Sequence, residues 1–207
     1  MDPGHQGKSD AKTEPNAPWD NTPKARVAGG CRGVKSGIME YEVVLQIGLR
    51  LRDLLKAQGA TVVLTRDTNE INISNKERAE LFNAHKVDLA IRLHLNNGNG
   101  RGAFMLVPRK HCTNWYEENI AAAGTIIAIY CADTGLPMVR EKDSGLTYRS
   151  DQTGFNWCER PIVCIEMGHL SNAEDDALFS DPAFWDVAAA ALCRGIAGYF
   201  EGTSNKE

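Results

Sequence analysis

Alternating helix-like and strand-like patterns predict that this chain is an α/β protein, a single domain whose sheet is covered by helices on both faces. Apolar residues recur at helical spacing in segments 40–58 and 116–133, whereas the runs at 61–66 and 161–165 are short and rich in β-branched residues. A length of 207 residues suits one domain of ordinary size. Ligands of such folds gather at the carboxyl ends of the strands, so we look for chemistry at that edge of the sheet.

The first expected helix, 40–58, is marked by both its apolar face and its end. Val43, Ile47 and Leu51 fall on one side of this helix, which predicts that this side is buried. Gly59 follows directly, and glycine is the residue type that most often ends a helix in the left-handed conformation.

Two later helices have signals in their first turns. Ser74 and Glu77 match a capping box, which predicts a helix through His85. Pro182 suits the first position of a last helix, which we expect to reach about Phe200. The expected strands are 61–66, 88–95, 103–107 and 161–165.

The segment 6–37 is rich in Gly, Pro, Lys, Asn and Ser and lacks apolar periodicity, so we expect a long loop. Loops of this length are uncommon in compact domains and are usually functional or disordered. The loop either borders a substrate groove with its basic side chains or is a mobile surface insertion. We expect the domain to span 1–202 and a polar tail to occupy 203–207.

The composition limits the classes of function. The 23 basic and 27 acidic residues are spread along the chain, and the net charge of −4 excludes nucleic-acid binding driven by bulk charge. No apolar run approaches the ~20 residues that a membrane helix needs, and segment 1–26 lacks the apolar core of an export signal. We therefore expect no membrane insertion by this chain and no export signal within it.

The six cysteines show no C-x-x-C spacing, which argues against zinc-ribbon and thioredoxin-type sites. Three of them lie in apolar stretches and are expected to be small buried side chains. A disulfide among the other three, Cys31, Cys112 and Cys158, remains an open alternative.

Four residues with the chemistry of an active site fall at the ends of expected elements. His5 stands at a tight turn where a strand would end, and Glu40 opens the first helix. His94 and Glu166 each end a later strand. Two imidazoles and a carboxylate are the ligand set of a catalytic zinc ion that keeps one position open for water, so His5, Glu40 and His94 are the candidate ligands. Glu166, after an apolar strand that would raise its pKa, is the candidate general base.

Each of these residues also has an ordinary structural interpretation. A glutamate at a helix N-terminus commonly interacts with the helix dipole and nothing else. A histidine at the end of a strand is commonly a hydrogen-bonded residue of the core. Spacing alone does not decide between these interpretations and a metal site.

Several motifs occur in the order found in one known family. The chain resembles the zinc-dependent N-acetylmuramoyl-L-alanine amidases of the amidase-3 type, which cleave peptidoglycan, from residue 1 to about 200. The motifs that carry this resemblance are Asp2-Pro-Gly-His5, Glu40-x-x-Val-Val-Leu45, Leu64-Thr-Arg66, Glu77-Arg78-Ala79, Leu93-His94 and Ile165-Glu166-Met-Gly-His-Leu-Ser-Asn172.

The resemblance implies a mixed, mostly parallel sheet of about six strands, whose first strand is cut short at Met1. It also implies one Zn²⁺ per chain, held by His5, Glu40 and His94, with Glu166 as the catalytic residue. The expected reaction is hydrolysis, by zinc-activated water, of the amide between N-acetylmuramic acid and L-alanine of the stem peptide. The expected partners are peptidoglycan and an activator or targeting protein, and the expected location is extracytoplasmic, in the cell wall or on the periplasmic side.

Two other functions remain open at this point: an inactive module that only binds peptidoglycan, and a zinc hydrolase that acts on another wall peptide. For Arg66 we expect a structural ion pair, and for His169 a packed or solvated side chain. The segment 95–101 is too short, and too rich in Asn and Gly, for a helix that plugs the site.

Overall fold

The sheet at the centre of the molecule has five strands in the order β1-β4-β7-β5-β6. The computed structural model describes residues 1–139 and 144–204. The strands of this sheet are β1 (Asp2–Pro3), β4 (Ala90–Asn96), β5 (Phe104–Pro108), β6 (Leu146–Arg149) and β7 (Ile162–His169). Neighbouring strands run parallel except β7 and β5, which are antiparallel, so the sheet is mixed and mostly parallel as expected.

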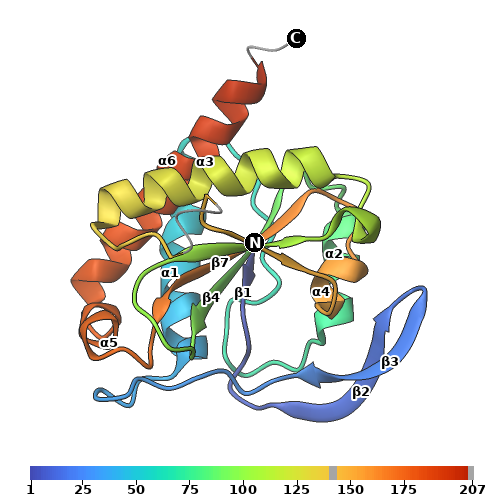
Figure 1. The fold of residues 1–207 in the computed structure, drawn as a ribbon, viewed down its shortest axis with the longest axis horizontal. Helices are drawn as coiled ribbons and strands as arrows, with labels where there is room; N and C mark the ends of the chain where they lie inside the picture. The colour runs from blue at the N-terminus through green and yellow to red at the C-terminus, as the bar shows by residue number, and fades with distance from the viewer. Residues whose placement is uncertain (140–143, 205–207) are drawn as a thin grey trace.

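Helices cover the sheet on both faces, which confirms the predicted α/β class (Figure 1). One face packs against α1 (Glu40–Ala57), α3 (Tyr116–Thr134) and α6 (Pro182–Ser204). The other face packs against α2 (Asn75–Ala84) and the short α4 (Thr153–Asn156). Between β7 and α6 lies α5 (Ala173–Phe179), and the short 3₁₀ helix η1 (Lys110–Cys112) precedes α3.

Successive strand residues point to opposite faces of the sheet, and this alternation positions the chemistry. In β4, Ile91 and Leu93 enter the larger core on the face of α1, α3 and α6, whereas Ala90 joins the smaller core on the face of α2 and α4. His94 is four residues after Ala90 in β4 and therefore points to the same face of the sheet. Glu166 of β7 lies directly opposite His94 in the parallel register. Both side chains therefore point to the face that carries α2 and α4.

The segment 61–66 was predicted to be a strand, and this prediction is wrong. The segment runs beside the first residue, whose amino group donates to Val63 O at 2.6 Å and whose carbonyl accepts from the Thr65 N–H at 3.1 Å. These two bonds do not form a ladder, so the segment is not part of the sheet. The sheet therefore has five strands instead of about six.

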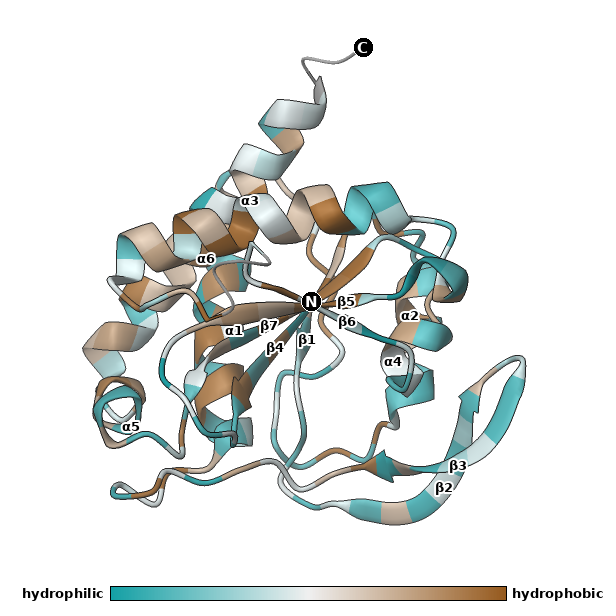
Figure 2. Cartoon of the chain, in the orientation of Figure 1, coloured by the Kyte–Doolittle hydropathy of each residue, from teal (hydrophilic) through white to brown (hydrophobic). Residues whose placement is uncertain are grey.

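The segment 6–37 is not a structureless loop, because it contains an antiparallel hairpin. The strands β2 (Asp10–Ala17) and β3 (Asp20–Val27) pair across a two-residue turn, Pro18-Trp19. The turn is not of the Asn-Gly type that signals a hairpin. Each strand also contains a proline, Pro15 opposite Pro23, and proline within a segment argues against a strand. The strands are largely hydrophilic, so they lack the apolar alternation that would have predicted them (Figure 2).

Polar contacts give the hairpin a defined place beside α2 and α4. Arg26 of β3 lies 3.1 Å from a carboxylate oxygen of Asp10 and 3.0 Å from one of Glu77 in α2. The indole N–H of Trp157, just after α4, donates to Pro15 O at 3.0 Å. The hairpin therefore extends the wall of the molecule on the face where His94 and Glu166 point.

The helix signals in the sequence are confirmed. Gly59 follows α1 with φ +88°, and the reciprocal bonds of the capping box join Ser74 and Glu77 at 3.2 and 2.7 Å. The last helix continues past the expected end at Phe200, and residues 205–207 of the expected tail lie outside the described residues. Among 1–139 and 144–204, no helix is both long and apolar enough to cross a bilayer.

The capping box and the Arg26 ion pair meet at Glu77, and two substitutions separate their contributions. Ser74→Ala removes the cap and is expected to lower the free energy of unfolding by about 0.5–2 kcal/mol. Glu77→Gln still accepts the Ser74 N–H and loses only a partly exposed ion pair, which we expect to cost less than about 1 kcal/mol. Urea unfolding measures both, and a Ser74→Ala protein as stable as the parent would contradict the role of the cap.

Candidate metal centre and active site

His5 is presented to the site by a turn that directly follows β1. Its backbone has φ +56°, and its Nδ1 lies 2.8 Å from Ala28 O. A proton on Nδ1 donates to this carbonyl, so Nε2 keeps its lone pair for a ligand. The preceding residue must be Gly4, because a Cβ there would lie 2.3 Å from the ring of His94.

Glu40 begins α1 and is almost completely buried. Its Oε2 accepts the Cys31 N–H at 2.8 Å and its Oε1 accepts the Leu95 N–H at 3.0 Å. Burial alone would raise the pKa of Glu40, but hydrogen bonds with His5 and His94 hold this pKa well below its ordinary range. The carboxylate is therefore ionised and fixed in orientation at neutral pH.

Three atoms with lone pairs converge at this point. His5 Nε2 and His94 Nδ1 each lie 3.1 Å from Glu40 Oε1, and the two nitrogens are 3.2 Å apart. Tetrahedral zinc with nitrogen and oxygen ligands at their usual bond lengths would separate these atoms by about 3.3 Å. Burial lowers the pKa of His94 to about 4, so its imidazole is neutral, as a metal ligand must be.

The donor set therefore fits a zinc ion. Lone pairs of two imidazoles and a carboxylate repel one another at this distance unless a cation or a proton lies between them. Within residues 1–139 and 144–204, His5, Glu40 and His94 form the one group of three or more such side chains that could hold a metal ion. The structure thus brings together the three side chains that the sequence predicted as candidate ligands.

Glu166 lines the same cavity from β7, opposite His94 on one side and Phe104 of β5 on the other. Its Oε2 is buried and has no hydrogen-bond partner among the described residues. Burial and the nearby charge of Glu40 raise its pKa to about 8, against the smaller opposing effect of Arg92 and Arg149. A carboxyl group with this pKa can both accept and return a proton near neutral pH.

The cavity opens between segments 28–31 and 94–97. Residues 97–102 after β4 are bends and extended chain without a helix, as the sequence predicted. No inserted helix of this segment therefore plugs the cavity.

A buried ionic cluster lies beneath the turn that carries His5, and the sequence analysis did not anticipate it. Asp2 is fully buried, and its carboxylate accepts from Arg78 Nη1, from Arg92 Nε at 2.8 Å and from the Thr65 hydroxyl at 2.6 Å. Arg78 also donates to His5 O at 2.9 Å. The cluster therefore ties the sheet, α2 and the ligand turn together.

Arg66 has a structural role, but the predicted ion pair is wrong. Its guanidinium donates to Pro3 O, Gly4 O and Tyr41 O at 2.8–2.9 Å, which are backbone carbonyls next to two of the candidate ligands. His169 is packed, as expected: its ring nitrogens lie 2.9 Å from Gly102 O and from Asn96 Nδ2. All six cysteines carry free thiols, so the disulfide that was left open is not formed.

The fold and the site define an α/β protein whose sheet carries a His–Glu–His group beside a buried carboxyl group. The sequence profile of the Amidase_3 family, described as N-acetylmuramoyl-L-alanine amidase, matches residues 1–198. The chain belongs to this family, which confirms the resemblance seen in its motifs. The activity is hydrolysis of the amide between N-acetylmuramic acid and L-alanine in peptidoglycan.

Known relatives match nearly the whole of this chain. The N-acetylmuramoyl-L-alanine amidase Rv3717 of Mycobacterium tuberculosis is 28% identical over 96% of this chain and 84% of its own. The germination-specific N-acetylmuramoyl-L-alanine amidase of Bacillus subtilis is 27% identical over 97% of this chain and 78% of its own. The crystal structure of the amidase Ami1 from Mycobacterium smegmatis superposes with a TM-score of 0.88, at 26% identity, over 97% of this chain and 95% of that one.

Asp2→Asn tests the ionic cluster. The substitution leaves Arg78 and Arg92 as buried charges without a counter-ion, so we expect the free energy of unfolding to fall by roughly 3–5 kcal/mol. The arginine charges hold the pKa of Asp2 well below its ordinary value against the effect of burial, so this stabilisation is present above pH ~4 and is lost as the pH falls.

The control is Asp53→Asn, which breaks an exposed pair with Arg52 and is expected to change stability by less than about 1 kcal/mol. Urea unfolding at pH 7 compares the two variants. An Asp2→Asn protein as stable as the control would contradict a structural role for the cluster.

Proposed function

We propose that this chain is a zinc-dependent amidase in which His5, Glu40 and His94 hold one metal ion and Glu166 moves the proton. The observation that carries the proposal is the approach of three ligand atoms to within 3.1–3.2 Å of one another. When bound, zinc would supply a Lewis acid that activates water as a nucleophile and polarises the carbonyl of the scissile amide.

Glu166 does the proton chemistry in this proposal. Its raised pKa suits a group that takes a proton from the attacking water and returns it to the leaving nitrogen of L-alanine. The buried, unpartnered Oε2 is available for this transfer, because no described side chain competes for it. Glu40 does not share this task in the proposal, because its Oε1 would hold the metal ion and its Oε2 accepts the Cys31 N–H.

Other chain groups would hold the ligands in place. Ala28 O fixes the tautomer of His5, and the N–H groups of Cys31 and Leu95 fix the carboxylate of Glu40. An inactive wall-binding module would have no need of this pre-organised donor set, which favours the enzyme. Since peptidoglycan lies outside the membrane, we propose that the chain acts extracytoplasmically, with an activator or targeting protein as a further partner.

The direct test of the activity is mass spectrometry of wall fragments digested by the purified chain, with and without a chelator. We expect free stem peptides that begin with L-alanine, and we expect the chelator to abolish them. Cleavage at another wall bond would support the alternative of a zinc hydrolase with a different substrate.

His94→Ala tests the metal ligands. Metal analysis after dialysis should give about one zinc per chain in the parent protein and a sharp decrease in the variant, because two ligands hold zinc far less tightly than three. The matched control is the exposed His85, whose replacement by alanine should leave the zinc content unchanged. Full zinc occupancy in His94→Ala would overturn the ligand assignment.

The two glutamates are separated by parallel substitutions. Glu166→Gln should retain zinc and the fold and lower the rate ~10²–10⁴-fold, because only the proton transfer is lost. Glu40→Gln should lose zinc together with activity. If Glu166→Gln loses its zinc instead, the roles of the two residues are exchanged.

A further inference from the structure

Three of the four tryptophans of the chain gather around one surface pocket that is separate from the metal centre. Trp19 comes from the turn of the hairpin, Trp115 immediately precedes α3, and Trp157 immediately follows α4. We call this hollow, with walls from the hairpin turn, α2, the segment 110–115 and the segment 156–159, the tryptophan pocket. None of its lining residues lines the metal cavity.

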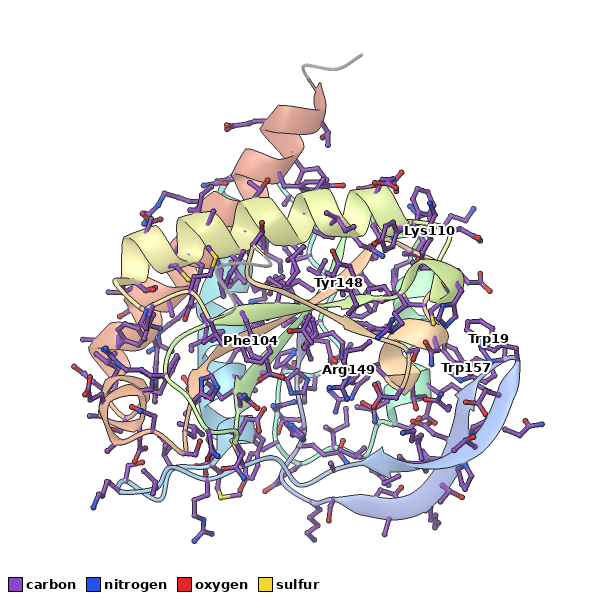
Figure 3. All side chains as sticks on the ribbon, viewed as in Figure 1. Trp19, Phe104, Lys110, Tyr148, Arg149 and Trp157 are labelled. Atoms are coloured by element: carbon purple, nitrogen blue, oxygen red, sulfur yellow. The ribbon has the colours of Figure 1, made fainter. Side chains whose placement is uncertain are left out.

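The hairpin carries Trp19 to the side of the molecule where Trp157 and Lys110 lie (Figure 3). Trp19 is 59% exposed, the highest value among the large apolar residues of the described chain, and it shares the pocket with two further tryptophans. It extends from the tip of the hairpin to the mouth of a concave site, which suits contact with a ligand.

The other two indoles are held rigidly. Trp157 donates its indole N–H to Pro15 O at 3.0 Å, and the ammonium of Lys76 lies 3.9 Å from its ring centre. Trp115 donates to Glu159 O at 2.8 Å. Lys76 does not line the tryptophan pocket, so its ammonium group contacts the Trp157 ring from outside the pocket. Rigid rings lose little conformational entropy when a ligand stacks on them.

Planar amide groups also line the pocket. Asn156 is 4% exposed, and its Nδ2 donates to Asn16 O and Ser150 O while its Oδ1 has no partner among the described residues. Asn114 of the same lining is exposed, so its amide can bind the hydroxyl or acetamido groups of a ligand.

The chemistry of the pocket favours a sugar. The flat C–H face of a pyranose ring stacks on an indole, and its hydroxyl and acetamido groups bind amides at the rim. The charged residues of the lining are Glu80, Glu159 and Lys110, so the pocket has no basic excess for nucleic acid or for an acidic peptide. The combination of indoles and amides therefore matches an uncharged polysaccharide.

The pocket and the metal cavity are connected through the hairpin. The chain runs from His5 into β2, whose eight residues span roughly 25 Å, and then to Trp19 at the turn. A small substrate cannot reach both places, but a polymer can. Resting on the proposed function, we infer that the tryptophan pocket is a second, non-catalytic site for the glycan strand of peptidoglycan, which holds the polymer while the metal centre cleaves its stem peptides.

The aromatic surface continues beside the pocket. A neighbouring hollow shares Lys110 and His111 with it and adds Tyr116 and Tyr148, whose rings stack with centres 6.3 Å apart. Tyr148 belongs to the edge strand β6, so the surface extends from the hairpin tip to the edge of the sheet (Figure 3). A glycan strand longer than a disaccharide would find further rings along this course.

The test uses the zinc-loaded protein and oligomers of β-1,4-linked N-acetylglucosamine, which contain no scissile amide and therefore probe glycan binding alone. The indole N–H signals of the four tryptophans are followed by NMR during titration. We expect those of Trp19, Trp115 and Trp157 to shift. The signal of Trp185, whose N–H donates to Phe179 O at 2.7 Å elsewhere in the structure, should not move.

A second arm measures sedimentation with insoluble peptidoglycan. Trp19→Ala, at an exposed position, should weaken binding roughly two- to tenfold, whereas Trp19→Tyr should restore most of it. The control Val187→Ala removes exposed apolar surface from α6 and should have no effect. Hydrolysis of a soluble disaccharide with one stem peptide should be unchanged in all three variants.

Absence of indole shifts with the oligomers, or wall binding by Trp19→Ala equal to that of the parent, would overturn the proposal. Shifts that appear only with free stem peptide would assign the pocket to a peptide and overturn it as well. The oligomers report binding without cleavage. Failure of the amidase assay would therefore contradict the proposed function, whereas the oligomer titration would still test glycan binding at the tryptophan pocket.

Discussion

The candidate active site depends on the ion pairs between the buried carboxylate of Asp2 and the guanidinium groups of Arg78 and Arg92. Two buried cations without a counter-ion would be strongly unfavourable, so Asp2 stabilises the region where β1, β4 and α2 meet. Arg78 also donates to the carbonyl of His5. Arg66 donates to the carbonyls of Pro3 and Gly4, the two residues that precede His5. The position of His5, the first candidate ligand, is thus set by charged groups that lie outside the candidate metal site.

The two glutamates of the site show how environment assigns different tasks to one residue type. Glu40 is surrounded by donors, with backbone N–H groups on both oxygens and histidines beside one, so it stays ionised. Glu166 lines the cavity and is less buried than Glu40, but its Oε2 is buried without a donor, and burial raises its pKa to about 8. An anion with fixed orientation is suited to hold a cation, and a carboxyl group that titrates near neutrality is suited to exchange a proton.

Much of the fold was predictable because its signals are local. The apolar face of α1, the capping box at Ser74 and the proline that opens α6 each depend on residues within one or two turns. Wrong or missing predictions concern elements without such signals. The hairpin has polar strands and a Pro18-Trp19 turn, and α4, α5 and β6 are short. The segment 61–66 has strand composition, but only two hydrogen bonds join it to the edge of the sheet.

The sequence by itself determined the α/β class and predicted four candidate site residues, because ends of strands and helices can be recognised from neighbours in the chain and the motifs occur in the order of a known family. Only the tertiary structure decided that His5, Glu40 and His94 meet within 3.2 Å, that Asp2 balances two buried arginines, and that the hairpin carries Trp19 to the tryptophan pocket. These arrangements join residues far apart in the sequence. They follow from sheet register, burial and long-range ion pairs, which cannot be predicted from the pattern of neighbouring residues in the sequence.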